Sequence, residues 1–303
     1  MPFLTMFTPS YNRGYLLPKL FESLQRQTCK EFEWIIVDDD SSDDTEEIVS
    51  QFVPKGFTIK YYRQRHGGKH RAINLGVKNA AGTWFFIVDS DDCLTDDAAE
   101  LIGEWTRDIS DNMICGVAGL KISTTGKTWG GDPNFQLDTF VEAGNLERKK
   151  YNLDGDKAEV YRTDILKKYP FPEFDNEYFV TEGVVWNAIA ADGYKLRWHN
   201  RPIYVCEYLE DGLTKGGANS HKGHMANING YAVYVKQIMN WCSFQEGINE
   251  FIEFDYCCRE KRMSLQLRAI CLNISAFSYA VWWGAALALR ACRKIIRIAN
   301  ERV

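Results

Sequence analysis

Short apolar runs alternate with amphipathic stretches along the first third of the chain. Four runs are each long enough for one strand of a sheet, at residues 3–8, 32–37, 57–63 and 83–88. Three segments between them have the spacing or end signals of helices, at residues 15–27, 43–52 and 67–80. Strands that alternate with helices of this length predict βαβ units and a parallel sheet.

The fourth apolar run ends abruptly in a polar cluster, DSDD at residues 89–92. Three carboxylates at the end of a buried strand would repel one another unless a cation joined them. Mg²⁺ and Mn²⁺ prefer oxygen ligands, commonly one or two carboxylates together with substrate phosphates. The cluster therefore predicts a metal bridge to a diphosphate, with a solvated turn that caps a helix near Thr95 as the structural alternative.

Two further polar clusters follow the first and second apolar runs, at residues 11–13 and 38–40. In a parallel sheet the carboxyl ends of the strands share one edge, which is where open α/β sheets bind their ligands. All three clusters are therefore expected to face a common crevice.

The segments TPSYNR, VDDDSSDDT, GGKHRAINLGV and VDSDD occur in this order and together resemble family 2 glycosyltransferases. The resemblance is strong over residues 3–125 and weaker to about residue 215. It implies the GT-A fold, an α/β architecture with a Rossmann-like, mostly parallel central sheet flanked by helices. To this fold the chain adds a C-terminal helical extension.

The resemblance also implies the roles of individual residues. Those placed at the donor nucleotide are Thr8, Tyr11, Arg13, Asp39, Lys69, Arg71 and Ser90. Among them, Asp39 is expected to hydrogen-bond the base, and Lys69 or Arg71 to lie along the diphosphate. Mn²⁺ or Mg²⁺ is expected on the DxD pair Asp89 and Asp91, with Asp92 as a ligand in place of either. As alternatives, Tyr11 packs on the sheet edge, and Lys69 and Arg71 form a solvated helix face.

Thr181 is a candidate N-cap for a helix that runs to about residue 191, which puts Glu182 in its first turn. The family resembled has a catalytic base at the start of this helix, often in a Glu-Asp pair. The second position is Gly183, so the role of base falls to Glu182. The alternative is a carboxylate that only stabilises the helix N-terminus.

Two later segments carry further expectations. Residues 194–208 suggest a hairpin that turns near Asn200. The glycine-rich segment after it contains four basic or imidazole side chains that would close over a bound diphosphate, namely Lys215, His221, Lys222 and His224.

From residue 226 the pattern becomes long, apolar and helical. Residues 269–289 carry no charge, and four basic residues follow within eight positions, Arg290, Arg293, Lys294 and Arg297. Three interpretations stay open: a helix packed on the protein or a second subunit, a helix in the plane of a membrane interface, and a membrane span. The divisions expected are 1–125 for the nucleotide sugar, 126–225 for the acceptor side and 226–303 for the helical extension.

Composition narrows the class of protein. The 303 residues have a net charge of −5, so no overall basic balance suggests binding to nucleic acid. The nine cysteines are scattered, without zinc-type CxxC spacing, and are expected to be reduced thiols. The N-terminus lacks the pattern of an export signal. We therefore expect a cytoplasmic protein, with the inner face of the cell membrane as a place of work.

These observations predict a metal-dependent, inverting glycosyltransferase. The donor is a nucleotide diphosphate sugar, with a UDP-sugar favoured, and the acceptor is a hydroxyl of a glycan or lipid-linked glycan for surface polysaccharide. Peripheral membrane contact through the C-terminal helix and a homodimer are the associations considered. The alternatives are a sugar nucleotidyltransferase and a non-catalytic nucleotide-sugar-binding protein.

Overall fold

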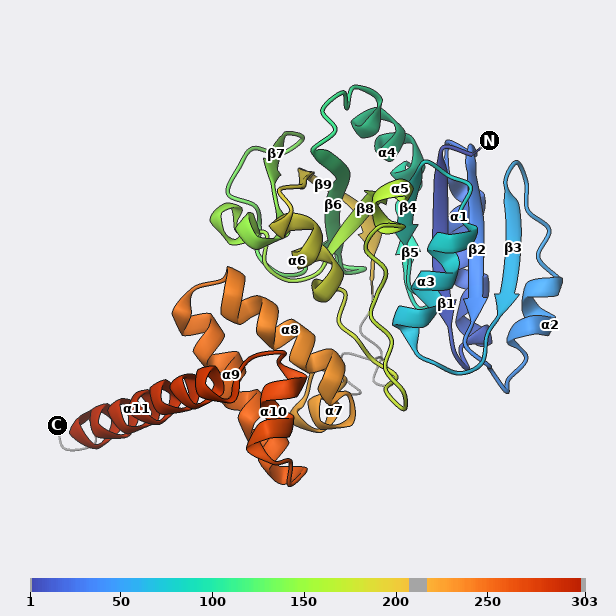
Figure 1. Ribbon diagram of the computed structural model, residues 1–303. Helices are drawn as coiled ribbons and strands as arrows, with labels where there is room; N and C mark the ends of the chain where they lie inside the picture. The colour runs from blue at the N-terminus through green and yellow to red at the C-terminus, as the bar shows by residue number, and fades with distance from the viewer. Residues whose placement is uncertain (1, 207–216, 301–303) are drawn as a thin grey trace. The chain divides into compact units, whose positions relative to one another are not determined.

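The structure, a computed structural model, describes residues 2–206 and 217–300 (Figure 1). The chain forms two compact units. The first comprises Met1–Phe171 and Val185–Gly212, and the second comprises Pro172–Val184 and Leu213–Val303. Each unit has its own hydrophobic core and is described by itself.

A mixed sheet of nine strands lies in the described part of the first unit (Figure 1). Its order is β3-β2-β1-β4-β8-β6-β9-β5, with β7 also paired to β9. Strands β1 to β4 run parallel, whereas β8 is antiparallel to both of its neighbours. The strands are β1 (Leu4–Ser10), β2 (Phe32–Asp38), β3 (Thr58–Arg63), β4 (Trp84–Ile87), β5 (Cys93–Leu94), β6 (Ile114–Ile122), β7 (Phe140–Ala143), β8 (Lys157–Arg162) and β9 (Lys195–Val205).

Helices flank this sheet (Figure 1) and pack on it through buried apolar side chains. In α1 (Leu17–Arg26) the buried side chains Leu17, Leu20 and Leu24 recur at helical spacing. The other helical elements of this unit are η1 (Gly14–Leu16), α2 (Thr45–Ser50), α3 (Lys69–Asn79), α4 (Ala98–Arg107), η2 (Asn145–Tyr151) and α5 (Thr163–Leu166). Helix α6 (Gly183–Ala191) has its first two residues in the segment Pro172–Val184 of the second unit and the rest in the first unit.

The predicted α/β fold class is confirmed, and the first four strands lie where the apolar runs placed them. The predicted hairpin over residues 194–208 is wrong, because β9 is one continuous strand. Between Trp198 and Pro202 it advances four residues while its partner β6 advances only two, from Ala118 to Leu120. The turn-forming residues near Asn200 are thus absorbed in a bulge, and the strand keeps its direction.

The two units divide the chain differently from the three segments expected from the sequence. Strands β8 and β9, which the sequence suggested for a separate acceptor-side part, hydrogen-bond into the same sheet as β4 and β6. Backbone pairing across the sheet therefore joins residues 157–162 and 195–205 to the N-terminal strands.

The second unit is helical and packs around Phe251, Phe254 and Tyr279, all nearly inaccessible to solvent. Its helices are α7 (His221–Ala226), α8 (Ile228–Trp241), α9 (Phe244–Glu260), α10 (Leu265–Cys271) and α11 (Ala276–Asn300). Among the described residues, no single helix is both long and apolar enough to cross a bilayer. Helix α10 and the segment 276–289 pass that test of length and composition only together, as a pair bent by 98°.

Candidate active site

The acidic loop follows β4 at the carboxyl edge of the sheet, as the sequence predicts. The Lys69 ammonium lies 2.7 Å from Asp89 Oδ1, and the Arg13 guanidinium lies 2.8 Å from Asp91 Oδ2. Although burial opposes ionisation, the cation of Lys69 and other nearby cations hold the pKa of Asp89 below its usual range. Two ion pairs thus join three segments that are distant in sequence: the loop after β1, the start of α3 and the loop after β4.

Asp92 has a different environment from the other two aspartates. Its carboxylate is buried and accepts a hydrogen bond of 2.8 Å from the Tyr204 hydroxyl, which itself accepts the Asp89 backbone N–H at 2.9 Å. Burial and the neighbouring Asp89 charge raise the pKa of Asp92 to about 7. The Lys121 ammonium lies 4.3 Å from the centre of the Tyr204 ring. Neither Tyr204 nor Lys121 was singled out from the sequence.

Asp39 anchors the turn that leads into α3. Its two carboxylate oxygens accept the backbone N–H groups of Gly67 and Gly68, each at 2.8 Å, and Oδ1 also accepts the side-chain amide of Gln64 at 2.7 Å. Gly68 has φ of +90°, a conformation that glycine adopts without strain. Asp39 thereby fixes the residue that immediately precedes Lys69.

An aromatic pair lies beside Asp39. The half-exposed Tyr11 ring stacks on His66 with a centroid distance of 4.3 Å and an interplanar angle of 25°. The His66 ring nitrogen Nδ1 is 2.9 Å from Asp39 Oδ2. Tyr11 therefore lies next to the residue predicted to bind the base, and no pattern in the sequence pointed to His66 as its partner.

Of the remaining predicted donor-site residues, Thr8 and Ser90 are buried and Arg71 is partly buried. Thr8 is fully buried, and its hydroxyl accepts a 2.9 Å hydrogen bond from Trp34 Nε1, so its side chain supports the end of β1 from within the core. Ser90 is also buried. Arg71 lies on α3 against Gly67, where an added Cβ would meet the Arg71 Cδ at 2.6 Å.

The segments that meet at this edge of the sheet lie within a match to a known protein family. The model of "Glycosyl transferase family 2" matches residues 5–169, just over half of the chain. The chain belongs to glycosyl transferase family 2. Family 2 membership agrees with the order of the four motifs and does not favour the nucleotidyltransferase alternative.

Curated relatives of this family 2 chain match over part of their length. A "PGL/p-HBAD biosynthesis glycosyltransferase" of Mycobacterium bovis is 32% identical over 151 residues, which cover 48% of this chain and 56% of that protein. A "GalNAc(5)-diNAcBac-PP-undecaprenol beta-1,3-glucosyltransferase" of Campylobacter jejuni is 26% identical over 188 residues, covering 61% and 59%. The chain thus spans less than two thirds of the length of these relatives.

Solved structures resemble the chain over nearly its whole length. S. aureus TarS 1-349 in complex with UDP-GlcNAc has a TM-score of 0.62 at 17% identity, covering 96% of this chain and 92% of that one. The mannosyltransferase PcManGT from Pyrobaculum calidifontis, in complex with GDP-Man and Mn²⁺, has a TM-score of 0.53 at 17% identity, covering 95% and 81%. Together with the family match, this similarity establishes the GT-A fold, including C-terminal helices.

The donor atoms of the acidic loop suit a hard divalent cation. Asp89 and Asp91 are only partly exposed, and each is already neutralised by a side-chain cation at hydrogen-bond distance. Such a pair of carboxylates can exchange these partners for a metal ion that is completed by phosphate oxygens. Asp92 is buried and bonded to Tyr204, so the accessible ligands are Asp89 and Asp91.

Glu182 belongs to the second unit, directly before α6. The Val184 N–H donates to the Thr181 carbonyl at 3.1 Å, so the first helical turn starts at the predicted cap. A cavity of about 240 Å³ opens in this unit beside Thr181 and is also lined by Tyr231, Tyr234 and Glu250.

The side chains expected to close over the diphosphate fall in the part of the chain assigned to the second unit. Lys215 lies outside the described residues. His221 and His224 lie on α7, where they contact acidic residues of α9.

Proposed function

We propose that this family 2 chain transfers a sugar from a nucleotide diphosphate sugar to a hydroxyl acceptor with inversion at the anomeric carbon. One observation carries the proposal: Asp89 and Asp91 meet Lys69 and Arg13 at the carboxyl edge of the sheet. The two carboxylates suit a divalent ion, and the two cations suit the negatively charged diphosphate. A site with both kinds of charge at one edge of the sheet therefore fits the ion and the diphosphate together.

The donor is bound by residues of the first unit. Lys69 and Arg13 neutralise the diphosphate, which becomes a better leaving group as its developing negative charge is stabilised. Asp39 accepts a hydrogen bond from the base, and Tyr11 offers a ring face beside it. A UDP-sugar is the favoured donor, supported by the fold similarity to TarS in complex with UDP-GlcNAc.

The cofactor proposed is Mn²⁺ or Mg²⁺ on Asp89 and Asp91. When bound, the ion supplies Lewis-acid stabilisation of the leaving diphosphate. The similarity to PcManGT, whose structure contains Mn²⁺, supports this choice of metal class.

Glu182 is proposed as the general base for the acceptor. A carboxylate that removes the hydroxyl proton during attack makes the acceptor oxygen a stronger nucleophile. Attack from the face opposite the leaving diphosphate inverts the anomeric configuration.

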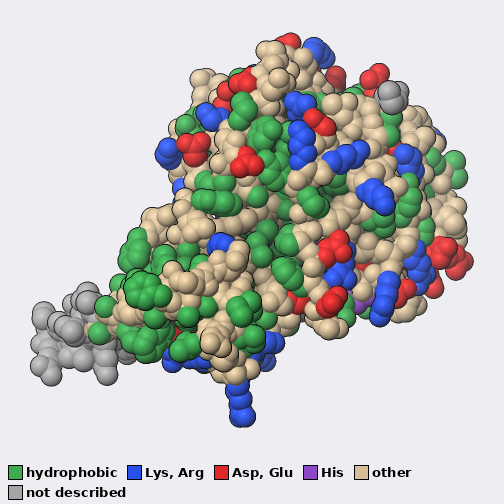
Figure 2. Space-filling model, viewed as in Figure 1, with side chains coloured by type: hydrophobic (Ala, Val, Ile, Leu, Met, Phe, Trp, Pro, Cys, Tyr) green, Lys and Arg blue, Asp and Glu red, His purple; other side chains and the backbone are tan. Residues whose placement is uncertain are grey.

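The acceptor proposed is a glycan or a lipid-linked glycan at the cytoplasmic face of the cell membrane. Support comes from the Campylobacter relative, whose name includes an undecaprenol-linked substrate. Hydrophobic side chains also gather over the C-terminal helices in Figure 2. Among the residues of these helices, Ile270, Phe277 and Val281 are exposed. An apolar face followed by basic residues is suited to an interface with anionic lipids.

Membrane contact is tested by flotation with anionic liposomes. Phe277→Asp combined with Val281→Asp should abolish flotation, because these side chains are 79% and 56% exposed and lie on the apolar face. Val53→Asp, at a side chain 72% exposed in the first unit, is the matched control. Loss of a dimer in the double variant, with no flotation of any form, would instead assign this face to a second copy of the chain.

The enzymatic proposal is tested with a panel of nucleotide sugars, each assayed for Mn²⁺-dependent thermal stabilisation and for sugar transfer. Asp91→Asn should abolish the metal-dependent stabilisation, which reflects donor binding directly. Asp96→Asn, which removes an exposed carboxylate paired with Arg26 elsewhere on the unit, is the control and should behave as wild type. Unchanged Mn²⁺-dependent donor binding by folded Asp91→Asn contradicts the metal assignment.

A further inference from the structure

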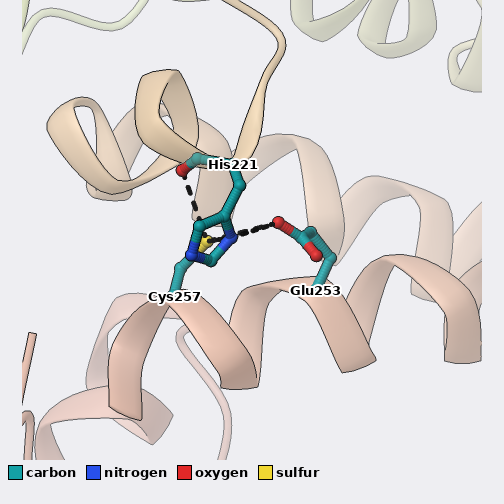
Figure 3. Close-up of side chains that lie close together, drawn as sticks. All are labelled: His221, Glu253 and Cys257. Atoms are coloured by element: carbon teal, nitrogen blue, oxygen red, sulfur yellow. Dashed lines mark hydrogen bonds and ion pairs between the residues drawn. The ribbon is translucent and has the colours of Figure 1, made fainter. Parts of the chain in front are cut away.

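Four side chains of metal-ligand type converge between α7 and α9 in the second unit. His221 and His224 are three residues apart on α7, and Glu253 and Cys257 are four residues apart on α9. Both spacings put the two side chains of a helix on one face. Figure 3 shows His221, Glu253 and Cys257 pointing toward one another.

The distances between three of these ligand atoms approach those of a tetrahedral zinc site. With usual zinc–ligand bond lengths, the sulfur–nitrogen and sulfur–oxygen edges of such a site are each about 3.6 Å and the nitrogen–oxygen edge about 3.4 Å. Cys257 Sγ lies 3.3 Å from His221 Nδ1 and 3.6 Å from Glu253 Oε1. His221 Nδ1 lies 2.6 Å from Glu253 Oε1, so only this edge has to open appreciably.

His224 lies beside these three side chains and has to move closer to them to provide the fourth ligand. Its Nδ1 is buried and has no hydrogen-bond partner within the described part of the chain, and Glu253 Oε1 is 3.9 Å away. The ring is held by stacking on Tyr231, with a centroid distance of 3.7 Å and an interplanar angle of 6°. A buried nitrogen without a hydrogen bond is costly unless something binds it.

Glu260 contacts the second ring nitrogen of His221. Its carboxylate lies 3.1 Å from His221 Nε2, on the side of the ring away from the cluster. Metal-binding histidines commonly donate the second ring N–H to a carboxylate, which fixes the tautomer and the ring orientation. Here that contact leaves Nδ1 as the ligand atom.

We propose that His221, His224, Glu253 and Cys257 form a structural Zn²⁺ site that ties α7 to α9. A thiolate and two imidazoles favour zinc over Mg²⁺ or Mn²⁺, which prefer oxygen ligands. With four protein ligands the site has no open position for a substrate, so its role is to stabilise the helical unit. It is separate in ligand chemistry from the proposed donor-site ion at Asp89 and Asp91.

Binding of the ion displaces protons and involves no change of oxidation state. Burial and the adjacent Glu253 raise the pKa of the Cys257 thiol to about 12, so without metal the thiol is protonated. Hydrogen bonds to Glu253 and Glu260 raise the pKa of His221. Zinc takes the place of the thiol proton and of the proton on His221 Nδ1, and both protons go to solvent.

The test is metal titration of the full chain, prepared under reducing conditions and stripped with a chelator. Co²⁺, which reports tetrahedral thiolate ligation by its absorption spectrum, serves as the probe, and Zn²⁺ should displace it at one equivalent per chain. Zn²⁺ should also raise the thermal midpoint of the stripped protein, whereas Mg²⁺ at the same concentration should not. Absence of stoichiometric binding overturns the proposal.

Variants assign the ligands. Cys257→Ser should lose the thiolate-to-cobalt band, and Cys258→Ser, at the equally buried neighbouring thiol, should keep it. His224→Phe retains a ring to stack on Tyr231 and should weaken Zn²⁺ at least about tenfold, and Glu260→Gln should weaken it about 10- to 100-fold. Asp91→Asn should bind Zn²⁺ as wild type does.

If Cys257→Ser fails to fold, the ligand assignment is decided by the cobalt spectra of His224→Phe and Cys258→Ser. A cobalt band that persists in folded Cys257→Ser, or one that is lost in Cys258→Ser, overturns the assignment. If His224→Phe binds Zn²⁺ as tightly as wild type does, His224 is not a ligand and the site is not closed by four protein ligands.

Discussion

His199 should make the first unit lose stability in mild acid. Its imidazole, on β9, stacks on Trp105 with a centroid distance of 4.0 Å and also contacts the Phe140 ring at 5.1 Å. The side chain is buried, and its Nε2 has no hydrogen-bond partner among the described residues. Burial and the nearby Arg197 charge lower the pKa of His199 to about 4.

The pKa shift sets both the sign and the size of the effect. Between pH 6.5 and 4 the unfolded chain binds a proton at this imidazole that the folded chain does not, so unfolding is favoured as the pH falls. The stability associated with neutral His199 is fully present above pH 6.5 and is lost as the pH falls toward 4. With these two pKa values, the linkage relation gives a loss of about 2 kcal/mol between pH 7 and pH 5.

The assay is urea denaturation of wild type and His199→Phe at pH 7 and pH 5. Phenylalanine keeps a ring between Trp105 and Phe140 but cannot titrate. The variant should therefore lose about 2 kcal/mol less unfolding free energy than wild type between pH 7 and pH 5. Phe140→Leu changes the packing on the same ring and keeps the imidazole, so its pH dependence should match that of wild type. Parallel pH dependence of wild type and His199→Phe would refute the reasoning.

Two further predictions concern the proposed catalytic base Glu182 and the packing of Gly76 in the first unit. Glu182→Gln should leave donor affinity nearly unchanged and lower turnover by about 10²-fold or more, as for a lost general base; normal turnover in a transfer assay would leave Glu182 only a helix-end role. Gly76→Ala should destabilise the first unit by about 1–3 kcal/mol in urea denaturation, because its Cβ would lie 2.3 Å from the Phe7 ring. Gly103→Ala, whose Cβ meets nothing closer than 3.5 Å, is its control and should cause no such loss.

The edge of the sheet that carries the acidic loop was predictable because its signals are local. Strands β1, β2 and β4 are buried and mostly apolar, and a cluster of polar residues follows the end of each. Parallel pairing then brings those stops together without any knowledge of side-chain contacts. The ion pairs Asp89–Lys69 and Asp91–Arg13 lie at this edge, but which side chains pair there was not predicted.

The contacts beneath the acidic loop could not be predicted in the same way. Tyr204 meets Asp92 although the two residues are 112 positions apart in the sequence. That meeting depends on the pairing of β5 with β9, which places Cys93 opposite Val205 and Leu94 opposite Tyr204. A bulge in β9 against β6 lies just before this pairing, and the surrounding sequence was interpreted as a turn. Because this segment was interpreted as a hairpin, Tyr204 was not predicted to contact the acidic loop.

The uncharged run at residues 269–289 shows how composition can fit two interpretations at once. The run is interrupted where Asn273 has φ of +50°, and the helices on either side form the bent pair. Beyond the bend, Tyr279 and Ala286 are buried at a spacing of seven residues and fasten α11 to the second unit, while Phe277 and Val281 face outward. One apolar stripe therefore stabilises the fold, and only the second stripe is available to a lipid surface or another subunit. Because deleting α11 would remove both stripes, the outward side chains alone must be changed to test membrane contact.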